Sequence, residues 1–232
     1  MSSILTEHIA LLDRSGCIVW SRSLSFNSWR RQVSHEPPIA ALKSLLSDAH
    51  GRLTVYLSSN LAYPVSLPWV DGLKNRADWQ RYALHVLSER YGRPPDSWHV
   101  CWSLPSYGQA ALAAGMDRSL WSQLNALPPR LGPVRPLLPY LMAQRSRTLD
   151  GNQTLLLLER ETLSWAGRHT AQWGEVGVVP RPEGHSITEL LETLHALGMN
   201  DPHPCFLVAD PDCGTLPVQA VGWALPMLDP AS

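Results

Sequence analysis

The part of the sequence that most constrains the fold runs from residue 53 to residue 91. Apolar and polar residues alternate through 53–57, which is the period-2 pattern of a strand with two unlike faces. Ser, Ser and Asn at 58–60 predict a turn, and the run at 61–69 is extended, with two prolines that suit an edge strand or a strand end. Apolar residues at three- and four-residue steps over 76–91 then predict an amphipathic helix. We expect strand, hairpin and helix to form one packing unit.

The same patterns predict two cycles of strands and helices along the chain. The elements expected in the first half are a hairpin over 8–20 with its turn at 13–16, an irregular segment at 22–38, a helix over 39–46, strands at 98–102, 110–114 and 134–138, and helices at 119–127 and 140–149. The alanine-rich run at 110–114 also suits a helix. The elements expected in the second half are strands at 154–159, 163–167 and 173–179, a helix at 186–197 with Ser186 as N-cap, and strands at 204–209 and 218–225. We therefore expect two related α/β halves, with domains at 1–150 and 151–232.

The composition is that of a globular chain with no strong charge preference. Of the 232 residues, 44% are hydrophobic and 17% are charged, and the formal net charge is −1. This balance gives no electrostatic reason to expect a nucleic acid or an anionic membrane as partner. The four cysteines form no CxxC pair, so we expect reduced thiols. Because the chain has neither a signal-peptide pattern nor an apolar run long enough to cross a bilayer, we expect a soluble, cytoplasmic protein.

Motifs for hydrolytic, metal and nucleotide chemistry are absent from the sequence. There is no GxSxG, HExxH, GxxxxGK[ST] or GxGxxG pattern. The best metal candidate is the segment that contains His203, Cys205, Asp210, Asp212 and Cys213. Zinc ligands are normally paired more tightly, and a loop around a buried strand is the favoured interpretation. We therefore predict no catalytic residue, no metal site and no cofactor-binding site.

The two predicted hairpin turns are candidates for phosphate binding, because main-chain N–H groups in a Gly-rich turn can hold a phosphate. The first turn, at 13–16, has only one glycine, and the second, at 159–162, has none and carries two carboxylates. Two acidic groups repel a triphosphate unless a cation lies between them. Both turns are therefore interpreted as structural.

Four short motifs carry a resemblance to a known family. They are LSSN at 57–60, LPW at 67–69, Trp79 in the predicted helix, and YG at 91–92 where that helix ends. In this order they resemble the PilM/GspL-like proteins, the actin-like cytoplasmic components of type IV pilus and type II secretion machines. The resemblance implies a fold of two RNase H-like halves, as in actin, which agrees with the two cycles of elements.

The resemblance also implies a scaffold function. Such domains sit on the cytoplasmic side of the inner membrane and hold inner-membrane partner proteins or an assembly ATPase. This sequence departs from the nucleotide-binding members, because their first phosphate loop has a DxG-type turn and Ser15 stands at its third position here. We therefore expect a non-catalytic adaptor without a cofactor, peripheral at the inner membrane through protein partners and with no direct membrane insertion. The oligomeric state is left open.

Two enzymatic alternatives remain from the sequence. One is an ATPase or kinase of the same superfold that uses Asp13 with altered loops. The other is an RNase H-like nucleic-acid-processing enzyme, which needs several carboxylates converging on two metal ions. The apolar strands at 155–158 and 206–209 offer almost none, so this alternative ranks last.

A candidate partner-binding surface is Trp29-Arg30-Arg31, in the segment expected to be irregular. An aromatic ring beside two cations is a composition favoured at protein interfaces. The plainer interpretation is a surface loop with Trp29 packed into the core.

Overall fold

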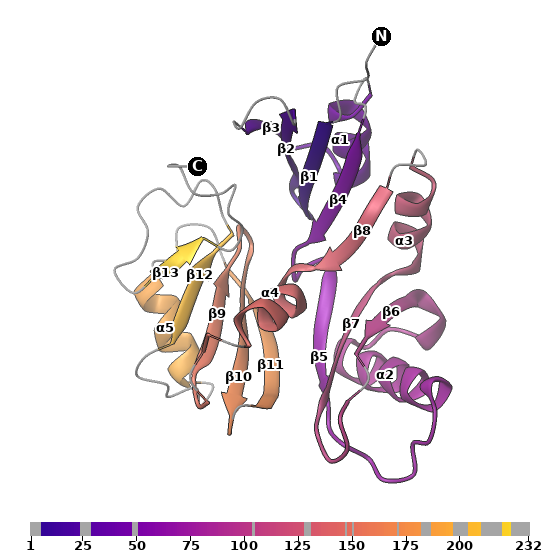
Figure 1. The fold of residues 1–232 in the computed structure, drawn as a ribbon, viewed down its shortest axis with the longest axis vertical. Helices are drawn as coiled ribbons and strands as arrows, with labels where there is room; N and C mark the ends of the chain where they lie inside the picture. The colour runs from indigo at the N-terminus through magenta and orange to yellow at the C-terminus, as the bar shows by residue number, and fades with distance from the viewer. Residues whose placement is uncertain are drawn as a thin grey trace.

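The structure is a computed structural model of the chain (Figure 1). It describes residues 6–23, 29–47, 51–103, 105–127, 131–146, 148–149, 151–170, 172–181, 187–196, 204–209 and 220–223. Within these residues the fold is mixed α/β, with two five-stranded sheets and one three-stranded sheet. No helix in these ranges is both long enough and apolar enough to span a membrane.

The first five-stranded sheet has the strand order β3-β2-β1-β4-β8. Its strands are β1 (Thr6–Asp13), β2 (Gly16–Ser23), β3 (Arg30–Ser34), β4 (Arg52–Leu57) and β8 (Leu131–Pro136). The first three form an antiparallel meander, while β4 and β8 run parallel to β1. Between β3 and β4 the chain passes through α1 (Pro38–Leu45), which begins at a proline suited to the first helical turn. The predicted hairpin and helix are confirmed.

The second five-stranded sheet repeats this topology with the order β11-β10-β9-β12-β13. Its strands are β9 (Thr154–Leu158), β10 (Thr162–His169), β11 (Gln172–Pro180), β12 (Cys205–Val208) and β13 (Ala220–Trp223). Again an antiparallel meander is followed by two parallel strands. A helix, α5 (Ile187–Ala196), again connects the third and fourth strands; its expected N-cap, Ser186, lies outside the described residues. The two predicted cycles are therefore present as two sheets of one topology.

A three-stranded antiparallel sheet with the order β5-β7-β6 is inserted between β4 and β8. The inserted elements are β5 (Ala62–Leu67), α2 (Arg76–Tyr91), the short 3-10 helix η1 (Pro95–Ser97), β6 (Trp98–Trp102), β7 (Ala111–Asp117) and α3 (Arg118–Asn125). α2 packs on this sheet through Trp79, Ala83 and Leu87. The alanine-rich run forms the central strand β7, because its residues pair with β5 on one side and β6 on the other.

The expected packing of residues 53–69 as a hairpin is wrong. The Ser58 N–H donates to the Leu12 carbonyl at 2.9 Å, and the Ser58 carbonyl accepts from the N–H of Leu61 at 3.0 Å and of Ala62 at 2.9 Å. This turn directs the chain out of the first sheet, so that β5 pairs with β7 and not with β4. Pro64 fits there because β5 is an edge strand of the inserted sheet.

The expectation of an irregular segment at 22–38 is also wrong. Arg30–Ser34 forms β3, which pairs antiparallel with β2 at the edge of the first sheet. Its side chains alternate between exposed and half-buried with no continuous apolar face. The sequence therefore lacks the alternation that usually reveals a strand.

The helix α4 (Leu137–Arg145) lies between the two five-stranded sheets (Figure 1). Its buried side chains are Leu137, Leu138, Leu141 and Met142. They belong to one core cluster together with Ile9 and Leu11 of β1 and Leu155 and Leu157 of β9. The two sheets therefore share an apolar core, and α4 is the element that joins them.

Cys17, Cys101 and Cys205 are free thiols, as expected of reduced cysteines, and Cys213 lies outside the described residues. Of the five candidate metal ligands only Cys205 is described, and it is buried in β12. His203, Asp210 and Asp212 also lie outside the described residues. Among the residues that the structure describes, no group of three or more His, Cys, Asp or Glu side chains is arranged to hold a metal ion.

Candidate binding site at the junction of the two halves

The β1–β2 turn and the β9–β10 turn occupy equivalent positions in the two sheets, and they meet at the junction of the two halves. The first turn depends on Gly16, because a Cβ there would lie 2.1 Å from the Ser34 carbonyl oxygen. Across the junction the Arg160 Nη1 lies 3.8 Å from Asp13 Oδ2 and 3.5 Å from Ser15 Oγ. The two turns are therefore in direct side-chain contact.

Both carboxylates of the second turn bind the loop that follows β4. The Asn60 side-chain amide donates to Glu161 Oε2 at 2.7 Å. The Ser59 N–H donates to Glu159 Oε1 at 3.0 Å, and the hydroxyls of Thr162 and Ser164 donate to Glu159 Oε2 at 3.0 and 2.9 Å. Glu159 and Glu161 thus tie the second half to the first through hydrogen bonds.

Glu159 is a buried carboxyl group, 3% exposed. Burial raises its pKa above the ordinary value, because the charged form loses its hydration, while the hydrogen bonds from Ser59, Ser164 and Thr162 act in the opposite direction. Such a group is tolerated in an interior only when its oxygens have hydrogen-bond partners. The three donors supply those partners.

Buried polar side chains are concentrated at this junction. Of the eight buried polar or charged residues in the described part of the chain, all but His8 lie here. The seven are Asp13, Ser58, Ser59, Asn60, Glu159, Thr162 and Ser164. A connected polar network in a low-dielectric interior fixes its members in one arrangement. The junction is therefore a specific polar contact and not an incidental one.

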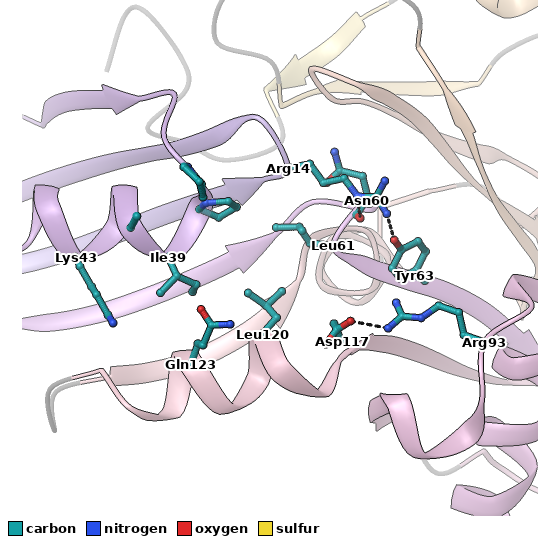
Figure 2. A pocket seen from close by; sticks show the side chains of 13 residues that line it. Arg14, Ile39, Lys43, Asn60, Leu61, Tyr63, Arg93, Asp117, Leu120 and Gln123 are labelled. Carbon is teal, nitrogen blue, oxygen red and sulfur yellow. Dashed lines mark hydrogen bonds and ion pairs between the residues drawn. The ribbon is translucent and has the colours of Figure 1, made fainter.

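A pocket of about 510 Å³ opens beside the junction, between α1, the start of β5 and α3 (Figure 2). Its apolar lining comes from Pro37, Pro38, Ile39, Ala40, Leu61 and Leu120. Its polar lining comes from Arg14, Lys43, Asn60, Tyr63, Arg93, Asp117 and Gln123. Arg14 and Asn60 belong to both the junction and the pocket, so the two regions are continuous.

The charged groups of the pocket differ in what they already bind. Arg14 donates to the Asn60 carbonyl at 3.0 Å and to the Tyr63 hydroxyl. Arg93 donates to Asp117 Oδ2 at 2.5 Å. Hydrogen bonds from Ser119 and from Arg93 lower the pKa of Asp117 to about 2, although burial acts in the opposite direction.

Lys43 is the remaining cation of the pocket. It lies on α1, is exposed, and makes no hydrogen bond or ion pair to any residue that the structure describes. Among the described residues that line the pocket there is no Ser, Cys or His, the commonest nucleophiles and bases of covalent catalysis. An apolar wall with an available ammonium group suits binding of an apolar side chain next to a negative charge.

The residues predicted as a partner-binding surface lie elsewhere. Trp29 is half-buried, packs against the shared core and has the Arg22 guanidinium over its ring at 4.7 Å. Arg30 and Arg31 are exposed on the edge strand β3. None of the three lines the pocket. The irregular location expected of Arg30 and Arg31 is corrected to β3, Trp29 lies just before that strand, and the role of the three as a binding surface stays a prediction.

Both turns and the SSN segment are visible in the sequence, but no local pattern in it places them side by side. The turns make hydrogen bonds across the junction, and their interpretation as structural stays a prediction. The pocket residues Arg14, Lys43 and Leu120 were missed, because none belongs to a motif. Only the folded chain brings α1 opposite α3.

The comparisons with known proteins agree on the fold. No family model matches the chain, and no curated protein matches it. The chain is similar to the cytoplasmic domain of EpsL, an inner membrane component of the type II secretion system of Vibrio cholerae, with 14% identity, a TM-score of 0.58, and coverage of 91% of this chain and 83% of that chain. It is also similar to a Bacteroides thetaiotaomicron protein of actin-like ATPase fold and unknown function, with 14% identity, a TM-score of 0.57 and coverage of 94% and 85%.

A third similar structure is a PilM-PilN type IV pilus biogenesis complex, with 12% identity, a TM-score of 0.52, and coverage of 90% of this chain and 82% of that chain. At these identities the likeness is one of fold. The chain therefore has the actin-like ATPase fold, built from two α/β halves of one topology. The resemblance to PilM/GspL-like proteins seen in the sequence is therefore confirmed for the fold.

Proposed function

We propose that this protein is a non-catalytic, actin-like scaffold or adaptor of a type IV pilus or type II secretion-like assembly system. Its partners are inner-membrane proteins of that system or the assembly ATPase, and it works in the cytoplasm, peripheral at the inner membrane through those partners. Two similar structures support the proposal, since one is described as an inner membrane component of a secretion system and the other as a pilus biogenesis complex.

The observation that carries the proposal is the pocket between α1 and α3. Its lining combines apolar side chains with the available Lys43 ammonium, and the described residues of the lining include no Ser, Cys or His. A short partner segment with an apolar side chain next to an acidic one matches this lining. Trp29, Arg30 and Arg31 are proposed as a second, separate contact, because exposed arginines beside an aromatic ring favour protein interfaces.

A binding experiment tests the pocket. The purified protein is titrated with the cytoplasmic segments of inner-membrane pilus and secretion proteins from the same genome, and with the assembly ATPase. We expect Leu120→Arg to lower the affinity for the partner by about tenfold or more, because the substitution places a charge in the apolar wall of the pocket. Lys43→Glu is expected to lower the same affinity by about threefold to tenfold, because the new carboxylate repels the acidic side chain of the partner.

Matched controls separate the pocket from general effects on folding and charge. Val70→Arg and Lys74→Glu make the same changes at exposed positions of the loop after β5, and both are expected to bind as the wild type does. Arg30→Glu reports on the second contact. Failure of every tested partner to bind, or equal losses in pocket and control variants, would count against the proposal.

A divergent ATPase or kinase of the same superfold is the second candidate. The fold itself favours it, together with Asp13 at the end of β1, which faces the junction of the two halves. Calorimetric titration with Mg-ATP separates the two, since the adaptor predicts no heat of binding and the ATPase predicts a saturable one.

A further inference from the structure

The carboxylate of Glu159 makes its contacts as a bound anion would. It belongs to the second half, yet its Oε1 accepts the main-chain N–H of Ser59 in the first half at 3.0 Å. The two residues are 100 positions apart in the sequence. The hydroxyls of Thr162 and Ser164 approach its other oxygen. Every one of these groups is a donor.

This set of donors is chemically suited to an oxyanion. A main-chain N–H at the end of a strand and two hydroxyls are groups that hold carboxylates and phosphates in proteins. Ser59, Thr162 and Ser164 are themselves buried, at 2%, 6% and 0% exposure. Without an acceptor, each donor would lose its hydration without compensation.

The neighbouring contacts fix the carboxylate in this position. The Glu159 N–H donates to the Thr162 carbonyl at 2.9 Å, which closes the turn, and the Arg181 side chain donates to the Glu159 carbonyl at 3.1 Å. Glu161 binds Asn60 next to it. The main chain around Glu159 is therefore held from both sides, and its side chain has little freedom to leave the junction.

We propose that the junction between the two halves is an oxyanion site whose occupant is the chain's own Glu159. The side chain takes the place of a small carboxylate or phosphate from solution and holds the two halves together without one. Removal of this side chain creates a site for a small oxyanion. The proposal concerns the junction alone and makes no use of the pocket between α1 and α3.

The test is chemical rescue of Glu159→Ala by formate, the smallest carboxylate. We expect the substitution to lower the melting temperature by about 4–12 °C, because the donors lose their acceptor. Sodium formate is expected to restore part of the lost melting temperature, with an effect that saturates as its concentration rises. Sodium chloride at the same ionic strength is expected to have no such effect. The wild type and Glu89→Ala, which removes an exposed glutamate of α2, should show no saturable gain.

Two outcomes of this experiment would overturn the proposal. One is a Glu159→Ala protein as stable as the wild type. The other is a formate response equal in all three proteins, which would indicate a general solvent effect. Calorimetric binding of formate to Glu159→Ala alone would support the proposal directly.

Hydrogen exchange in the wild-type protein provides a test that needs no variant to fold. The Ser59 amide is expected to exchange at least about tenfold more slowly than the amide of the exposed loop residue Gly72, relative to their intrinsic rates, because its hydrogen bond must open first. Exchange of both amides at their intrinsic rates would overturn the proposal. Partner binding at the pocket is measured separately, so that failure of one proposal is distinguishable from failure of the other.

Discussion

Glu159 is a carboxyl group held in the protein interior, where its charged form is disfavoured. It is buried, and its pKa is raised by burial in spite of hydrogen bonds from three residues. The polar and charged groups that contact it are Ser59 from the loop after β4, Thr162 and Ser164 on β10, and Arg181 after β11. Its titration should therefore be visible in the stability of the whole protein.

We predict a specific pH dependence from this residue. Because its pKa in the folded protein lies above the ordinary value of 4.5, the folded state binds its proton more tightly than the unfolded state does. Its contribution to the free energy of unfolding is fully present below about pH 4.5 and is lost as the pH rises through the folded-state pKa. Glu159→Gln removes this titration and keeps the shape of the side chain.

Urea unfolding of the wild type and Glu159→Gln between pH 4 and pH 8 checks this prediction. The free energy of unfolding of the wild type, minus that of the variant, is expected to fall as the pH rises. Glu89→Gln serves as the exposed control and should follow the wild type. A difference that rises with pH would mean that the hydrogen bonds outweigh burial and that the pKa is lowered.

At the scale of the element, α2 was predicted at the residues where it is found, whereas the partners of the strands around it were not. Its N-cap Asn75 accepts the Asp78 N–H, and it ends at Gly92, which has a left-handed φ of 65°. Both signals are local in the sequence. The change of sheet between β4 and β5 depends on a turn that bonds to β1, so no local pattern could reveal it.

The packing of α2 on the inserted sheet gives a second prediction. A Cβ added at Gly115 of β7 would lie 2.8 Å from Leu87 Cδ1 and 2.9 Å from Trp98 Cε3. We expect Gly115→Ala to lower the free energy of unfolding by about 1–3 kcal/mol, because the contact is overpacked. Chemical denaturation measures this loss.

Gly174→Ala on β11 is the matched control for that substitution. The nearest atom to an added Cβ there is 3.9 Å away, an ordinary contact distance, and we expect a change within about 0.5 kcal/mol. Equal effects at the two glycines would show that backbone entropy, and not the close contact with α2, determines the result.

At the scale of the whole molecule, the helix α4 and the turns at the junction connect the two halves in different ways. α4 contributes four buried apolar side chains to a core that includes both central strands. The turns contribute the hydrogen bonds and the Asp13–Arg160 contact. The domains proposed at 1–150 and 151–232 are therefore coupled, and we expect them to unfold together.

Leu138→Ala tests this coupling. Leu138 is fully buried in α4, so the substitution is expected to cost about 2–5 kcal/mol. If the halves are coupled, circular dichroism and tryptophan fluorescence should show one coincident transition at a lower denaturant concentration. Two separated transitions in the wild type would contradict the prediction. Leu194→Ala in α5, which packs in a cluster of the second half alone, serves as the comparison.

The sequence by itself determined the elements and their order in two cycles, because periodicity, caps and glycine stops act between residues a few positions apart. Its motifs also pointed to the actin-like fold. β3 remained hidden because an edge strand with exposed cations has no apolar alternation to display.

Only the tertiary structure decided which strands share a sheet, that β5 leaves the first sheet, and that Ser59 meets Glu159. These contacts join residues far apart in the chain, and many different pairings satisfy the same local pattern. The pocket follows the same rule, since its walls α1 and α3 are separated in the sequence by β4 and most of the inserted elements. The choice among pairings is made by burial of one common core and by hydrogen bonding of the polar groups that this burial encloses.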